Sequence, residues 1–112
     1  MACTGSWDRK KGDRIRITIA EVSNALTFGM KVTCTPNSPT DPKGEFTRQE
    51  LEQGVGWLLT AATYDLIVFV VPKPGGPAVL KERVEFDGAV AHDHPDCTLQ
   101  KNQSCDFEIR VH

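Results

Sequence analysis

The chain has 112 residues, enough for one compact domain over residues 1–112 and too few for two. Thirteen Lys and Arg residues against fifteen Asp and Glu residues give a formal net charge of −2, which argues against a nucleic-acid partner, because nucleic-acid binding normally needs a basic surface. The longest apolar run, residues 66–71, is far shorter than the ~20 residues of a membrane-spanning helix, so no transmembrane segment is expected.

The first predicted strands alternate apolar and polar side chains. Residues 14–19 place three isoleucines on one side and two arginines with a threonine on the other, and residues 30–34 repeat the alternation with Met30, Val32 and Cys34 inward. A period of two is typical of a strand with one buried face. We therefore predict two half-buried strands in the first third of the chain.

A loop and the one predicted helix follow. Residues 35–44 contain three prolines among Asn, Ser, Thr and Asp, which is typical of a loop. Thr47 and Glu50 have the spacing of a capping box, in which each side chain satisfies a free backbone N–H at the start of a helix. Because Gly54 then ends the pattern, the helix is predicted near residues 48–53.

The second half of the chain returns to strands. Residues 64–71 are apolar on both faces, which predicts a strand at the centre of a sheet. Three prolines and two glycines in residues 72–77 end that strand in a stiff loop, and residues 78–86 and 105–111 alternate again. About six or seven strands with one short helix predict an all-β fold, an antiparallel Greek-key β-sandwich.

One stretch resembles part of a known group of folds. The residues spaced by two before the most apolar strand are Leu58, Thr60, Ala62 and Tyr64. This arrangement resembles the tyrosine corner of immunoglobulin-like and fibronectin type III-like β-sandwich domains. The resemblance implies that the Tyr64 ring packs inside and that its hydroxyl bonds a backbone group upstream. Since position 66 is Leu and not Cys, the inter-sheet disulfide of antibody domains is absent, and the resemblance implies no activity.

Four cysteines allow disulfide bonds without any metal-like spacing. They are Cys3, Cys34, Cys97 and Cys105, and no C-x-x-C pair occurs among them. Folding the chain back about Lys101 sets Cys97 opposite Cys105 across a hairpin, which leaves Cys3 to pair with Cys34. We expect these two disulfides, and four buried reduced thiols are the alternative.

The expected disulfides bear on location, because such bonds persist outside the cytoplasm. Residues 1–11 do not look like an export signal, so the protein either stays inside the cell or has lost a leader. We favour a secreted, periplasmic or cell-surface location. A lipid anchor at Cys3 is a less favoured variant of this expectation.

Residues 90–97 hold the densest set of potential metal ligands. His92 and His94 would point the same way on a strand, and Asp96 adds a carboxylate of the kind that zinc or copper accepts. Pro95 and the aspartates beside it instead favour a turn with a solvated surface. A metal-binding accessory protein is therefore an alternative, and no cofactor is expected.

Nothing in the sequence indicates catalysis. No G-x-S-x-G nucleophile motif occurs, and Gly75 and Gly76 lie between prolines, which remove the N–H donors that a phosphate loop needs. We expect a non-enzymatic binding or adhesion module, because prolines reduce the entropy that a loop loses on docking.

The expected partner is a protein, and less favourably a glycan. The main alternative is a small secreted inhibitor that inserts a proline-rich loop into a protease or another hydrolase. Trp7 is interpreted as a surface contact or as a cap on the open end of the sandwich, whereas Trp57 is expected in the core. The candidate contact residues are Trp7, Asn37, Pro39, Asp41, Lys73, Pro74, Gly75, Lys101 and Asn102.

Overall fold

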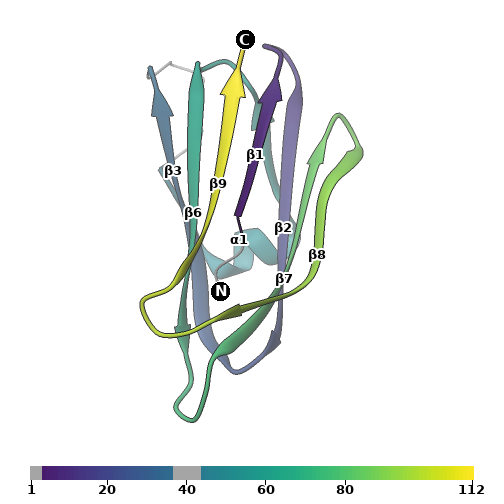
Figure 1. Ribbon diagram of the computed structural model, residues 1–112. Coiled ribbons are helices and arrows are strands. Elements are labelled where there is room, and N and C mark those ends of the chain that lie inside the picture. The colour runs from purple at the N-terminus through teal and green to yellow at the C-terminus, as the bar shows by residue number, and fades with distance from the viewer. Residues whose placement is uncertain (1–3, 37–43) are drawn as a thin grey trace.

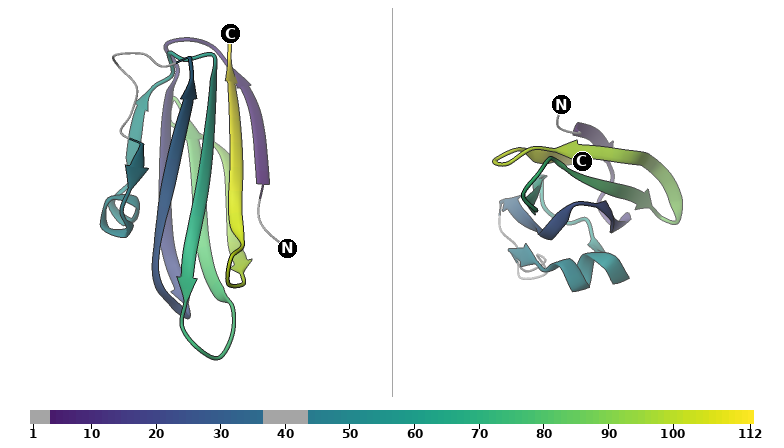
Figure 2. Two further views of the ribbon diagram at one scale, coloured as in Figure 1. Left: turned by 90° about the vertical axis from the view of Figure 1, so that its left-hand side faces the viewer. Right: turned by 90° about the horizontal axis from the view of Figure 1, so that it is seen from below.

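The computed structural model describes residues 4–36 and 44–112, except for the side chains of residues 21 and 93–96. Most of the described chain is β-strand, in two sheets that form two layers (Figure 1). Figure 2 shows the layers from the side and from below. The mainly β, two-sheet architecture predicted from the sequence is confirmed.

The first sheet has five strands in the order β1-β9-β6-β3-β4. Their bounds are β1 Thr4–Arg9, β9 Ser104–Val111, β6 Thr63–Pro72, β3 Ala25–Thr35 and β4 Glu45–Phe46. The apolar strand β6 lies at the centre of this sheet, as its sequence predicts. β1 runs parallel to β9 while the other pairs are antiparallel, so the prediction of a wholly antiparallel fold is wrong.

The second sheet has four antiparallel strands in the order β5-β2-β7-β8. Their bounds are β5 Val55–Leu58, β2 Arg14–Ser23, β7 Ala78–Phe86 and β8 Ala89–Leu99. Helix α1, Arg48–Gln53, begins after Thr47 with both hydrogen bonds of the predicted capping box in place. It buries Leu51 beside β2 and β3.

The apolar faces of the two sheets meet in one core. The three isoleucines of β2 are fully buried, and so are Met30 of β3 and Ile109 of β9, which confirms the predicted direction of these faces. Trp57 is also buried, stacked on Phe46 with ring centroids 5.9 Å apart.

The described residues contain nine strands, more than the six or seven predicted. Strands β1 and β4, which were not predicted, are short or polar, and they are strands because a longer neighbour pairs with them. Residues 90–97, predicted as a turn, belong to β8. The turn lies instead at Asp87 and Gly88, both with positive φ, and β8 is an edge strand, where a proline is tolerated.

The strand order also limits the resemblance to immunoglobulin-like domains. There the last two strands share a sheet, whereas here β8 and β9 lie in different sheets. The structure therefore shares with those domains only the two-sheet architecture and the position of Tyr64. Among the described residues, no helix has the length and apolar character needed to cross a lipid bilayer.

Candidate functional site

Two loops that are separate in the sequence lie at the same end of the molecule (Figure 1). They are the β6–β7 loop and the β8–β9 loop, and together with the adjoining ends of β6 and β9 they line a groove of about 700 Å³. The lining residues are 69–76 and 100–104. Five of the nine candidate contact residues therefore come together here, namely Lys73, Pro74, Gly75, Lys101 and Asn102.

Asn24 holds the β6–β7 loop in place from the connection between β2 and β3. Its side-chain Nδ2 donates to the carbonyl oxygens of Lys73, Gly76 and Pro77, at 3.3, 2.9 and 3.1 Å. Its own carbonyl accepts from the Lys73 N–H at 2.9 Å. Asn24 has a φ of 57°, a conformation that Asn tolerates better than most residues. These bonds and the prolines fix the loop before any partner arrives.

The β8–β9 loop is a tight turn held by Gln100 and Gln103. The backbone N–H of Gln103 donates to the Gln100 carbonyl at 3.1 Å, and the Gln103 side-chain oxygen accepts from the Gln100 N–H at 2.7 Å. Asn102 takes the positive φ of 67° that closes the turn. Lys101 and Asn102 are consequently presented to solvent at the tip.

The groove combines an apolar floor with positive charge. Val71 is 46% exposed, and the half-buried Phe69 ring lies over Gly29, where an added Cβ would be 2.7 Å from the ring. Among the residues that line the groove, the charged ones are Lys73 and Lys101, one on each loop and both exposed. Such a surface attracts an anionic group and can bury an apolar one.

The remaining candidate contact residues lie elsewhere. The half-buried Trp7 ring packs against Phe86, His92 and Phe107, with centroid distances of 5.7, 6.0 and 5.8 Å. The ring therefore packs at the edge of the core, and both interpretations of Trp7 stay predictions. Asn37, Pro39 and Asp41 lie outside the described residues.

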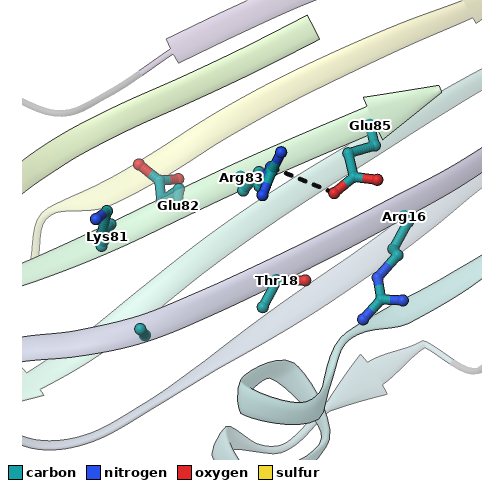
Figure 3. A pocket seen from close by; sticks show the side chains of 7 residues that line it. Arg16, Thr18, Lys81, Glu82, Arg83 and Glu85 are labelled. Atoms are coloured by element: carbon teal, nitrogen blue, oxygen red, sulfur yellow. Dashed lines mark ion pairs between the residues drawn. The ribbon is translucent and has the colours of Figure 1, made fainter. Parts of the chain in front are cut away.

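A second depression, of about 450 Å³, lies on the outer face of the four-stranded sheet (Figure 3). It is lined by Arg16, Thr18, Ala20, Lys81, Glu82, Arg83 and Glu85. The Nε of Arg83 forms an ion pair with Glu85 at 3.3 Å, and Nη2 of Arg16 donates to the carbonyl of Gln53 at 3.2 Å. Acidic residues therefore line this depression beside its cations, whereas no acidic residue lines the groove.

The predicted disulfide and metal sites take a different form in the structure. Cys97 and Cys105 are not opposite each other across a hairpin, since Cys97 pairs with Leu80 of β7 and Cys105 with Val68 of β6. Their sulfurs face each other across the core at 2.9 Å, longer than the ~2.05 Å of a disulfide bond. Cys97 and Cys105 are therefore not joined to each other.

The other members of these predicted sites can be placed only in part. Cys3, the expected partner of the half-buried Cys34, lies outside the described residues. His92 is half-buried beside Phe107. The side chains of His94 and Asp96 also lie outside the described part, although the backbone register sets His94 directly across from Glu82.

Glu82 is a core residue that the sequence interpretation missed. It is 0% exposed, and burial raises the pKa of its carboxyl to about 7, although the Cys105 thiol, which donates to Oε1 at 3.6 Å, acts in the opposite direction. Its position in the strand could have identified it, because Glu82 stands between Leu80 and Val84, which both face inward. A charged residue at a core position of an alternating strand indicates a special environment.

The described chain thus offers an open groove, a surface depression and a buried carboxylate–sulfur cluster. Comparisons with protein-family models, with curated proteins and with solved structures found no match. The groove combines two exposed lysines, an apolar floor and preformed walls, and no acidic residue lines it.

Proposed function

We propose that the protein is a non-enzymatic binding module whose groove takes an extended segment of a protein partner. The observation that carries the proposal is the convergence of the β6–β7 and β8–β9 loops on one groove, each with one exposed lysine. A groove of about 700 Å³ lies within the range of pockets that hold small ligands or a few side chains.

The chemistry of the groove favours an acidic segment with an apolar anchor. Lys73 and Lys101 attract carboxylates, while Phe69 and Val71 provide a surface on which an aromatic or branched side chain is removed from water. Since Asn24 fixes one wall, little conformational entropy is lost when the partner binds.

The alternative of a hydrolase inhibitor is less well supported. An inhibitory loop enters the cleft of its target and must project from its own protein. Here both loops form the walls of a concave surface, which suits a receptor for a peptide better than an inserted loop. The expected location outside the cytoplasm rests on disulfide formation, which mass spectrometry with and without reductant measures.

The proposal is tested by selecting a displayed library of random peptides on the immobilised protein and measuring the selected peptides in solution by fluorescence anisotropy. We expect selected sequences to combine Asp or Glu with aromatic or branched apolar residues. The double variant Lys73→Glu/Lys101→Glu should weaken their binding by about tenfold or more, since each lost charge contact contributes up to about 1 kcal/mol and repulsion adds to this loss.

The matched control is Lys10→Glu/Lys11→Glu, which changes the net charge equally at exposed positions outside the groove. It should keep the affinity within about twofold. Selected peptides without acidic residues, or an equal loss of binding in the control, would contradict the proposed function.

A further inference from the structure

An apolar strip runs along the outer face of the five-stranded sheet. The side chains of β6 alternate between the core and this face, and Ile67, Phe69 and Val71, here called the β6 strip, point outward. Ile67 is 39% exposed and Val71 is 46% exposed. A sheet face turned to water normally carries polar side chains, so the β6 strip is an unusual surface for a solvated face.

The neighbouring strands leave the β6 strip uncovered. Phe69 lies in register between Gly29 of β3 and Ser104 of β9, which are both small residues (Figure 1). Because Gly29 has no side chain, the Phe69 ring lies over it, at the position where an added Cβ would be 2.7 Å away. The middle of the strip is therefore open to a partner.

The β6 strip connects the groove with a second depression. Phe69 and Val71 line the groove, whereas Ile67 lines a depression of about 490 Å³ farther along the same face. Outward side chains that follow one another on a strand are only about 6.6 Å apart, twice the rise of one residue. An extended segment that leaves the groove along β6 consequently enters this second depression.

The two ends of this track carry opposite charge. The groove holds two lysines, whereas the charged residues that line the second depression are Asp65, Asp106 and Glu108. Glu108 forms an ion pair with Arg110, so we assign recognition to Asp65 and Asp106, which are both exposed. Opposite charges at the two ends favour a partner that carries the complementary charges in the same order.

The charges of this face are not arranged for stability. Asp65 lies directly opposite Glu108 in the register of β6 and β9, and like charges at directly opposite positions destabilise a sheet. Lys31 of β3 instead lies beside the groove, since its Nζ is 5.8 Å from the centroid of the Phe69 ring. A basic group of a partner, placed over the second depression, would relieve the repulsion between the two carboxylates.

We propose, on the basis of the function proposed above, that the partner segment is bipolar. Its acidic end lies in the groove, its alternate apolar side chains lie on the β6 strip, and its basic end lies over Asp65 and Asp106. Asp65 and Lys73 are eight positions apart, a span of roughly 26 Å in a strand, so an extended segment of about nine residues reaches from one end to the other. Either chain direction satisfies this order of charges.

The experiment measures the binding of fluorescein-labelled peptides to the full chain by fluorescence anisotropy. The peptide EDFSV fits the groove alone, and EDFSVSVKR extends it along the β6 strip. Each peptide is also made with its sequence reversed, and the tighter direction is used. We expect EDFSVSVKR to bind at least tenfold more tightly than EDFSV. KDFSVSVER has the same composition with mixed charges and should bind at least fivefold more weakly than EDFSVSVKR.

The double variant Asp65→Asn/Asp106→Asn tests the basic end of the segment. It should weaken the binding of EDFSVSVKR at least fivefold and leave that of EDFSV within about twofold. Asn has the size of Asp, so the variant is expected to fold, as circular dichroism can verify. The matched control is Glu52→Gln/Asp87→Asn, which changes the net charge equally at exposed positions outside both depressions and should keep both affinities within about twofold.

Equal affinities of EDFSV and EDFSVSVKR, or of EDFSVSVKR and KDFSVSVER, would overturn the bipolar segment. An equal loss in the control variant would do the same, and so would a dimer in sedimentation velocity that Ile67→Asp dissociates, since a second copy would then cover the β6 strip. Binding of neither peptide would also overturn this inference, whereas the proposed function is decided by the peptides selected from the library.

Discussion

The hydroxyl oxygen of Tyr64 accepts a hydrogen bond from the backbone N–H of Thr60 at 2.9 Å and a second from Ala61 at 3.1 Å. Tyr64 is 0% exposed, so its ring packs in the core while its hydroxyl satisfies two amide groups of the connection that precedes β6. The tyrosine thereby fixes the entry of the central strand into its sheet.

Tyr64→Phe keeps the ring and removes both hydrogen bonds. Because it leaves two N–H groups without their partner, we expect the free energy of unfolding to fall by about 1–3 kcal/mol. Urea unfolding followed by circular dichroism measures this loss. A variant as stable as the natural protein would show that the hydroxyl does not hold the turn.

Asn24→Asp tests whether Asn24, in the connection between β2 and β3, holds the β6–β7 loop in place. Asp tolerates the positive φ of this position, but its carboxylate cannot donate to the carbonyl oxygens of Lys73, Gly76 and Pro77. We expect exchange of the Lys73 amide hydrogen, which is bonded to the Asn24 carbonyl, to accelerate at least tenfold. Asn102→Asp is the control, since Asn102 has a similar φ of 67° on the other loop. Equal acceleration at Lys73 in both variants would contradict the role given to Asn24.

The pKa of Glu82 predicts that the stability of the protein depends on pH. Burial raises this pKa from 4.5 to about 7, so the folded state holds the proton more tightly than the unfolded state does. The contribution to stability is complete below about pH 4.5 and is lost as pH rises through about 7, a change on the order of 3 kcal/mol. As the pH rises from 5 to 8, the free energy of unfolding of Glu82→Gln should therefore increase relative to that of the natural protein.

Comparing the natural protein with Glu82→Gln cancels the pH dependence that comes from the carboxylates present in both. Glu85→Gln is the control, because Glu85 lies on the same strand, in an ion pair with Arg83 at the outer face. Its profile should run parallel to that of the natural protein. Parallel profiles for Glu82→Gln as well would show that Glu82 is not a strained core carboxylate.

Trp7→Ala distinguishes the two interpretations of this residue. The ring packs on Phe86 and Phe107 and covers Gly5, where an added Cβ would be 2.5 Å from it. We expect a loss of about 2–4 kcal/mol in the free energy of unfolding, because an aromatic side chain is removed from the edge of the core. Unchanged stability with weakened peptide binding would make Trp7 a surface contact instead.

The parts of the fold that the sequence predicted are those determined by local patterns. Alternation located β2 and β9, the capping box located α1, and a doubly apolar run located the central strand β6. Strand β1 could not be found in this way, because its polar sequence becomes a strand only by pairing with β9. Strand β8 was missed because its acidic residues and Pro95 are typical of turns, whereas an edge position tolerates both.

The candidate sites were predictable to a smaller extent. Proline, glycine and asparagine identified Lys73, Pro74, Gly75, Lys101 and Asn102 as loop residues, but only the strand order brings the two loops together. The sequence could not show that Cys97 and Cys105 approach from different sheets. The burial of Glu82 was missed, although this residue lies between Leu80 and Val84 on the inward face of β7.

The most direct test of the proposed function is a nuclear magnetic resonance titration of the ¹⁵N-labelled protein with a selected acidic peptide. We expect the largest backbone shift changes at residues 69–76 and 100–104, which line the groove. Changes centred on Arg16, Lys81 and Arg83 at the outer face of the four-stranded sheet, or no saturable change at all, would contradict the assignment of the groove as the binding site.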